Sequence, residues 1–324
     1  MDGAVPTISY PRVINESLEK KGFVEAHNTN IEKESLSFVD LSETVFGNAV
    51  EAALEYHRRG LMVTPLHGKR PVLKNWQQRE LSTQEISHYF GGERNVGIVL
   101  GGLARIADVD LDIPVAITIA DLILPDSMES GREKSPRSHR WFISDPAPPS
   151  RRYSLTKSMA ARLMIERGET TLIELRGAGQ LTMVPPSIHP VSGDRCLWYP
   201  SVICEIDGEV LAELVLDVAI AALLVLNRPL GSREWFAIHA AGYLNPRVGR
   251  ERTEAIVNAA SSAFDDEEHD ERMWAVRSSL QKPISADPTI DVAMAAELER
   301  LAPGVPDAIS HWYERGRRHR GGAR

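Results

Sequence analysis

The sequence is poor in cysteine and has no long apolar run, and both absences exclude classes of protein. Only Cys196 and Cys204 occur in 324 residues, so a disulfide framework or a four-cysteine zinc site is impossible. No window of eighteen apolar residues exists, which excludes a membrane-spanning helix. The first residues, MDGAVPTISYPRV, contain no basic stretch followed by an apolar core, so we expect no secretory signal. Together these absences predict a cytoplasmic protein that makes no contact with a membrane.

An overall excess of positive charge is also missing, which argues against a protein that coats nucleic acid non-specifically. The formal net charge is −8 at pH 7. Positive charge is instead concentrated locally: residues 131–168 carry nine basic and three acidic side chains, and residues 315–324 carry five arginines and no acid. A charge run is most often a solvated surface, but these two stretches are where we expect phosphate groups to bind.

The sequence contains no Gly-x₄-Gly-Lys-Ser/Thr motif, the loop that holds nucleotide phosphates in P-loop helicases. A helicase activity would therefore come from a separate protein or from a part outside this sequence. No internal repeat is evident, and low complexity is limited to the Arg/Gly residues near the end.

The pattern of apolar residues predicts two folded regions with a tail at each end. Residues 1–41 are polar and lack periodicity, so we expect a flexible N-terminal extension. Residues 42–200 mix strand and helix patterns, which predicts an α+β domain with mixed sheets flanked by helices. Residues 207–315 show helical periodicity without strand-like alternation and predict a small all-α domain. Residues 316–324 form a basic tail.

Local signals place the elements of the α+β region. A helical stripe covers 42–59, and Ser82 with Glu85 forms a capping box that begins a second helix. Pro114 suits the first turn of a helix that reaches about residue 124. Apolar runs predict strands at 61–66, 96–100, 103–111, 140–143, 171–175 and 181–184.

The sharpest chemical feature is the pair Asp108 and Asp110 inside the predicted strand 103–111. Residues two apart on a strand project from the same face, so the two carboxylates are expected to lie side by side. Carboxylates on one largely buried face repel each other unless a cation lies between them, and hard cations such as Mg²⁺ take such oxygen ligands. The alternative is an ordinary strand end that meets a loop. Asp112 is expected to face the other way and is left outside this site.

Two further segments carry residues suited to binding phosphate or metal. His139 enters a strand within the basic stretch and could contact phosphate oxygens, although a histidine there is more often an ordinary strand-end residue. Glu174 adds a third acid at the end of an apolar strand. The turn from Gly177 to Gly179 after it either lets the backbone approach a ligand or simply closes a hairpin.

The segment PPSIHP, which begins at Pro185, offers hydrogen-bond donors on a stiff loop. Its prolines restrict the backbone. Ser187 and His189 are available to bond a ligand. Gly193, Asp194 and Trp198 follow.

In their order and spacing, these segments resemble the primase–polymerase (Prim-Pol) branch of the archaeo-eukaryotic primase superfamily, over about residues 47–200. The matched segments are Lys69-Arg-Pro71 with Trp76, Asn95-Val-Gly-Ile98 with Gly101, the Asp-x-Asp pair, the motif ending in His139, Glu174 in IELRG, and PPSIHP with Trp198. Six ordered segments make this match far more specific than any one motif. The histidine motif of the family often has a small residue two positions before the histidine, where this chain has Arg137.

The resemblance implies a metal site and a nucleotide site. Asp108, Asp110 and Glu174 would coordinate two catalytic divalent metals, Mg²⁺ or Mn²⁺, and would act in catalysis together with His139. Two such metals can activate a 3′-hydroxyl and neutralise a leaving pyrophosphate. The residues implied to contact the incoming nucleotide are Arg137, Ser138, His139, Arg176, Ser187 and His189.

The second region resembles the helical domain that follows many Prim-Pol domains and is implicated in primer initiation. Ser232-Arg-Glu-Trp235 and Ala240-Ala-Gly242 carry this resemblance. The alternative is a small helical bundle that only stabilises the first domain.

The function implied is that of a DNA primase/polymerase. It would use nucleoside triphosphates to synthesise primers on a single-stranded DNA template and to extend them by two-metal nucleotidyl transfer. Two other classes remain open: a catalytically idle replication initiator or DNA-binding protein, and a metal-dependent nuclease. Nucleotide incorporation and strand cleavage would separate these activities.

Overall fold

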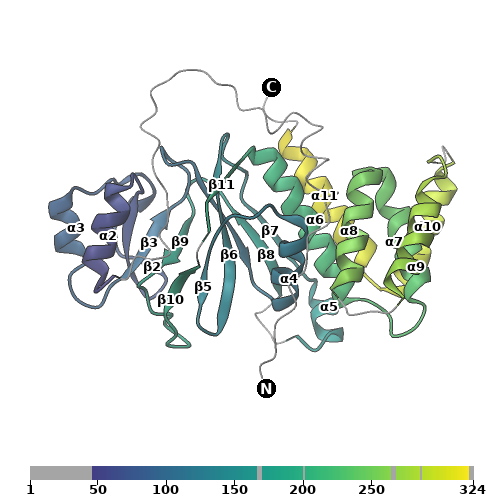
Figure 1. Ribbon diagram of the computed structural model, residues 1–324, viewed down its shortest axis with the longest axis horizontal. Helices are drawn as coiled ribbons and strands as arrows, with labels where there is room; N and C mark the ends of the chain where they lie inside the picture. Colours follow the sequence, from purple (N-terminus) through teal and green to yellow (C-terminus); the bar gives the residue numbers. More distant parts are fainter. Residues whose placement is uncertain (1–45, 166–169, 200, 264–267, 285–286, 321–324) are drawn as a thin grey trace. The chain divides into compact units, whose positions relative to one another are not determined.

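The computed structural model describes residues 46–165, 170–199, 201–263, 268–284 and 287–320. Strands occur up to Ile206, and within these ranges only helices follow, which confirms the predicted α+β class (Figure 1). The predicted N-terminal extension, residues 1–41, and the last residues of the basic tail, 321–324, lie outside the described ranges. None of the helices in these ranges combines the length and the apolar character that a membrane span requires.

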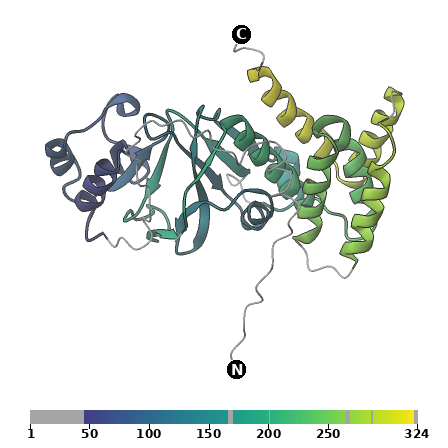
Figure 2. The same cartoon turned by 45° about the horizontal axis from the view of Figure 1, so that its top comes forward.

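The first three strands of the described chain form a four-stranded antiparallel sheet together with a later strand, and two helices lie beside it. The strand order is β2-β1-β3-β9, with β1 at Val63–His67, β2 at Arg70–Pro71, β3 at Asn95–Val99 and β9 at Leu181–Val184. Helices α2 (Ala49–Arg58) and α3 (Thr83–Tyr89) pack against each other beside this sheet (Figures 1 and 2), and the short 3₁₀ helix η1 covers Trp76–Gln78. The capping box of α3 is confirmed, because the Ser82 hydroxyl accepts from the Glu85 N–H and the Glu85 carboxylate accepts from the Ser82 N–H.

A seven-stranded sheet follows, in the order β10-β5-β6-β4-β8-β7, with β11 added parallel to β6. The remaining pairs are antiparallel. The strands are β4 (Ile106–Leu111), β5 (Met128–Arg132), β6 (Ser135–Ser144), β7 (Arg151–Ser154), β8 (Thr171–Arg176), β10 (Cys196–Tyr199) and β11 (Cys204–Ile206). Helix α4 (Pro114–Ile123) begins at the predicted proline, and α5 covers Lys157–Arg162.

The chain passes between the two sheets three times, and two of these passages are glycine turns. Gly101 and Gly102 lie between β3 and β4, and Gly177 to Gly179 lie between β8 and β9. The second turn is therefore not a hairpin, because its two strands pair in different sheets. The turns touch each other: Gly101 has a φ of +80°, and a Cβ there would stand 2.7 Å from Ala178 Cα. This close approach holds together the strand ends at which the chain leaves one sheet for the other.

Alternate residues of β4 face two different apolar cores. Val109 is buried in a core that also contains side chains of α4 and α6. Ile106, on the other face, packs in a second core with Trp141 and with strands of the four-stranded sheet. Asp108 and Asp110 alternate with Val109, so they lie on the face turned toward the four-stranded sheet.

Six helices follow the sheets in the described chain. They are α6 (Gly208–Leu226), α7 (Arg233–Val248), α8 (Arg250–Ser262), α9 (His269–Leu280), α10 (Pro288–Leu301) and α11 (Val305–Arg320). Helix α6 contacts β7, β8, α4 and α8, and it lies between the seven-stranded sheet and α8 in Figures 1 and 2. One apolar core contains buried side chains of β4, of β8 and of each of the six helices. The sheet and the helices therefore bury each other's apolar surface.

Candidate functional site

Four charged side chains form a row across four neighbouring strands of the seven-stranded sheet. Asp110 of β4 lies directly opposite His139 of β6 on one side and Glu174 of β8 on the other. Glu174 in turn lies opposite Arg152 of the edge strand β7. Directly opposed residues of a sheet point to the same face. We call His139, Asp110, Glu174 and Arg152 the charged row, and Asp108 lies beside it on β4.

The carboxylate of Asp108 is completely buried next to the charged row. His139 Nδ1 lies 3.0 Å from Asp108 Oδ2, and the Thr182 hydroxyl donates to the same oxygen at 2.6 Å. Burial opposes ionisation, but the positive charges of His139 and Arg176 lower the pKa of Asp108 below its ordinary value. Burial likewise opposes protonation of His139, but Asp108 and Asp110 raise its pKa. Asp108 and His139 thus form a hydrogen-bonded pair in which each group favours the charged form of the other.

Arg176 places its guanidinium among the three carboxylates that the sequence predicts to bind metal. Its Nη2 hydrogen-bonds to Asp110 and lies 2.7 Å from Glu174 Oε2, and its Nη1 lies 3.7 Å from Asp108 Oδ2. Arg152 bonds to Glu174 from the end of the row. Burial disfavours the charge of Arg176, yet the three carboxylates raise its pKa. Two arginines and a histidine therefore neutralise the acids within the protein.

The contacts of Arg176 also test whether these carboxylates suit a divalent cation. A single guanidinium nitrogen lies between oxygens of Asp110 and Glu174, so a positive charge already occupies the space between them. Carboxylate oxygens are the donors that Mg²⁺ and Mn²⁺ prefer. In the part of the chain that the structure describes, no three Asp, Glu, His or Cys side chains are arranged as a metal site. The three acids offer the type of oxygen donor that a divalent cation takes, but in this structure Asp110 and Glu174 are bonded to Arg176.

Asp112 lies on the same side as the charged row, so the expectation that it faces the other way is wrong. One residue separates it from Asp110, just as one residue separates Asp110 from Asp108, and strand alternation therefore returns all three to one face. Although the Asp112 side chain is exposed, partial loss of surrounding water and the negative charges of Asp110 and Glu174 raise its pKa above the ordinary value. Asp112 is thus a fourth carboxylate close to this site.

Arg137, which the sequence assigns to the nucleotide site, pairs with acids of neighbouring elements. Its φ of +56° breaks the alternation of β6. Its guanidinium lies 2.7 Å from Asp121 of α4 and 2.6 Å from Glu129 of β5, and Arg140 bonds to the same two acids. A positive φ is a conformation that favours glycine, so Arg137 holds a backbone geometry that is uncommon for a residue with a long side chain. The intervening residue, Ser138, is buried.

The PPSIHP loop lies against the four-stranded sheet. The buried Ser187 hydroxyl accepts from a backbone N–H of β3 at 2.8 Å, and His189 Nδ1 accepts from the Ser192 N–H at 3.2 Å. The Asn95 amide holds the loop by donating to Ile188 O at 2.7 Å and accepting from the Ile188 N–H at 2.9 Å. Among the described residues, no hydrogen bond or ion pair joins Ser187 or His189 to the charged row.

Sequence reasoning missed Thr182 and the position of Arg152 in the charged row. Thr182 is the one polar residue in the apolar strand 181–184, and this was the available signal. Arg152 shows no such signal, because only the pairing of β7 with β8 places it opposite Glu174.

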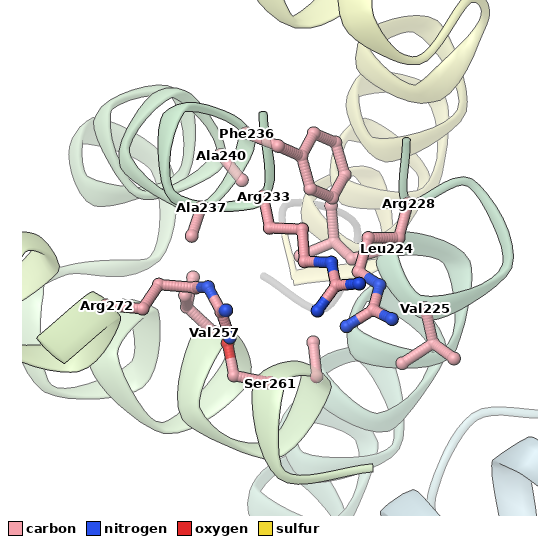
Figure 3. A pocket seen from close by; sticks show the side chains of 11 residues that line it. Leu224, Val225, Arg228, Arg233, Phe236, Ala237, Ala240, Val257, Ser261 and Arg272 are labelled. Atoms are coloured by element: carbon pink, nitrogen blue, oxygen red, sulfur yellow. The ribbon is translucent and has the colours of Figure 1, made fainter. Parts of the chain in front are cut away.

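Two hollows lie next to charged side chains. The first, of about 450 Å³, lies between β7, β8 and α11, with Glu174 and Arg176 in its wall. The second lies among the helices, where Figure 3 shows the side chains of Arg228, Arg233 and Arg272 around it. Its volume of about 20 Å³ is enough for about one water molecule and not for a nucleotide. Of these two hollows, the first is the one that meets the charged row.

A comparison with known families identifies the sheet region. The family model described as bifunctional DNA primase/polymerase, N-terminal (Prim-Pol), matches residues 53–214, half of the 324-residue chain. The match covers both sheets and the whole charged row, and it ends inside α6. No curated protein matches the chain.

Proposed function

The chain belongs to the Prim-Pol family of bifunctional DNA primase/polymerases, and on this premise we propose that it is a template-dependent nucleotidyltransferase that begins primers on single-stranded DNA and extends them. The family implies nucleotidyl transfer in DNA replication, and its members generally use divalent metals. The observation that supports the specific activity is the charged row. It places Asp110 and Glu174, with Asp108 beside them, between a histidine and an arginine on one sheet face.

In the proposed reaction, the 3′-oxygen of one nucleotide bonds to the α-phosphorus of the next. The bond between the α- and β-phosphates breaks, pyrophosphate leaves, and the hydroxyl proton is released to water. Divalent cations held by Asp108, Asp110 and Glu174 would ease loss of that proton and neutralise the pyrophosphate. Asp110 and Glu174 would release Arg176 on binding a cation, which frees its guanidinium for a phosphate oxygen.

In the proposed reaction, His139 contacts the triphosphate of the incoming nucleotide. Its Nδ1 is engaged by Asp108, which leaves Nε2 to donate to a phosphate oxygen. The raised pKa of His139 favours the charged form, which binds phosphate more strongly than the neutral form.

Replacing His139 with glutamine is expected to raise the KM for the incoming nucleotide about tenfold or more. The loss of one charge-assisted hydrogen bond costs about 1.5–3 kcal/mol, and the glutamine amide can still bond to Asp108. Extension rates measured against nucleotide concentration would show this change, with template affinity measured in parallel. An unchanged KM with a large loss of template binding would reverse the assignment.

The other assignments to the nucleotide pocket, Arg137, Ser138, Ser187 and His189, stay predictions. In this proposal the helical region, residues 207–315, contributes contacts that help to begin a strand. Beginning a strand requires two separate nucleotides to be held together on the template, which additional contacts make easier.

The test of the proposed function is a reaction with unprimed single-stranded DNA, labelled nucleoside triphosphates and Mg²⁺ or Mn²⁺, analysed on a denaturing gel. We expect labelled products whose composition depends on the template. Shortened template strands without labelled products would indicate a nuclease. DNA binding without either product would indicate a catalytically idle DNA-binding protein.

A further inference from the structure

The hollow between β7, β8 and α11 joins the end of the charged row. Its volume of about 450 Å³ lies within the range of about 300–1,000 Å³ that is common for ligand pockets. Glu174 and Arg176 form one part of its wall, and His311 and Arg315 of α11 form another. We call this hollow the α11 cleft.

The α11 cleft has an excess of positive charge. Arg151, Arg152, Arg176 and Arg315 all line it, and Glu174 is the one acid in its lining. The carboxylate of Glu174 already bonds to Arg152 and Arg176. The Glu174 carboxylate therefore does little to neutralise the charges of Arg151 and Arg315.

Arg151 and Arg315 repel each other across the cleft. Burial and then the nearby charge of Arg315 lower the pKa of Arg151. Within the described residues, neither guanidinium forms an ion pair with a carboxylate, and Arg151 Nη1 bonds to a backbone carbonyl, that of Ser150, at 3.2 Å. Two unpaired guanidinium groups that line one cleft provide the charge and the hydrogen-bond donors for a phosphate.

The side chains of α11 are held against the sheet edge by an aromatic contact. The rings of Tyr153 on β7 and Trp312 on α11 lie 5.4 Å apart at an angle of 77°. Arg315 is one helical turn beyond Trp312 and shares its side of the helix. The edge strand and the helix therefore hold Arg151 and Arg315 on opposite walls of one cleft.

We propose that the α11 cleft holds the phosphates of the nucleotide that supplies the 3′-hydroxyl. These are the 5′-triphosphate of the first nucleotide when a strand is begun, and backbone phosphates of the primer when a strand is extended. The inference rests on the proposed function, which assigns the incoming triphosphate to the His139 end of the row. The nucleotide on the other side of the acids then lies at the Arg152 end.

The dimensions of the sheet agree with two adjacent nucleotides. His139 and Arg152 are three strand spacings apart, and each spacing is about 4.8 Å, so the row is about 14 Å long. The acids lie between its two ends. A nucleotide at each end would meet its neighbour at the acids.

The first arm of the test measures binding without catalysis. A labelled primer–template duplex is titrated with the full chain in EDTA, and Arg151→Gln and Arg315→Gln are compared with the wild type. We expect each variant to raise the Kd about fivefold or more and to lower the salt slope by about one counterion. Arg250→Gln, which removes an exposed charge at the start of α8, is the matched control and should leave the Kd unchanged. An unchanged Kd in both cleft variants would contradict primer-backbone binding.

The second arm measures strand initiation and distinguishes the two sources of phosphate. Dinucleotide synthesis on unprimed template is followed against the concentration of the first nucleotide, supplied as the triphosphate or as the unphosphorylated nucleoside. We expect the cleft variants to raise the KM for the triphosphate about tenfold and to leave the KM for the nucleoside unchanged. An equal change for both forms, or for neither, would contradict triphosphate binding.

Thermal unfolding of each variant separates loss of binding from loss of fold. A wild-type chain that binds the duplex through Arg151 and Arg315 but incorporates no nucleotide would refute the proposed function and support the phosphate site. If both cleft variants incorporate nucleotides at the wild-type rate and bind the duplex with an unchanged Kd, the assignment of the phosphates to the α11 cleft is refuted. The proposed function is then left intact.

Discussion

Replacing Asp110 with asparagine is expected to reduce nucleotide incorporation by at least about 100-fold while the fold is retained. The substitution keeps the size of the side chain but removes a negative charge that would hold a catalytic cation. A bound cation contributes several kcal/mol to the stabilisation of the transition state, and each 1.36 kcal/mol corresponds to a factor of ten in rate. The measurement is extension of a primed template under saturating nucleotide. Thermal unfolding is recorded on the same preparation.

Asp270→Asn provides the matched control. Asp270 is an exposed acid in the first turn of α9, and its loss should leave the extension rate unchanged. Wild-type extension by the Asp110 variant would show that the metal site has been assigned to the wrong residues.

Ending the chain at Ile206, which removes all six C-terminal helices, is expected to prevent folding of the sheet region. The described part of α6 alone contributes several completely buried apolar side chains to the core that covers β4 and β8, among them Leu211, Val215, Val218 and Leu223. Burial of each contributes about 1.5–3 kcal/mol. Their combined loss is comparable to the whole stability of a typical domain, about 5–15 kcal/mol.

Circular dichroism and thermal unfolding of residues 1–206 test this expectation. The control is a chain that ends at Arg320, which keeps all the described helices. A cooperative transition of the short chain, at a temperature close to that of the control, would show that the sheets fold without the helices.

The sequence predicts the central elements of the fold well, because their local signals agree with their final environment. The buried strands β3, β4, β8 and β9 are apolar runs in the sequence. The N-terminal cap of α3 is predicted by the spacing of Ser82 and Glu85. The strands β2, β5, β7, β10 and β11 escaped prediction. Of these, β7 and β10 are four residues each, at the edges of the seven-stranded sheet, and β7 reads Arg-Arg-Tyr-Ser, which has no apolar alternation. Their pairing comes from the neighbouring strand, which local sequence does not show.

Only the part of the candidate site that lies on a single strand could be predicted from the sequence. The spacing of Asp108 and Asp110 places them on one face, and the same rule applied to Asp112 would have kept it with them. The contacts of Arg176 depend on the register between β4 and β8, which a single sequence does not provide. The turn of Arg137 toward α4 depends on a positive φ inside a strand.

The register also changes what is expected of Asp108. From the sequence alone, removing one of several neighbouring acids should relieve repulsion. In the folded chain Asp108 is buried and bonded to His139 and Thr182, with Arg176 nearby. Removing one member of such a buried charged pair leaves the other without a partner and is strongly destabilising. The more exposed Asp110 is therefore the better position for testing catalysis.

The most direct test of the central claim, template-directed nucleotidyl transfer at the charged row, is single-nucleotide incorporation. The wild-type chain is incubated with Mg²⁺ or Mn²⁺ and four primed templates that differ only in the next template base, each with one labelled nucleoside triphosphate at a time. We predict incorporation of the complementary nucleotide on each template by the wild type and none by Asp110→Asn. Incorporation that ignores the template base, or equal incorporation by the Asp110 variant, would contradict the account.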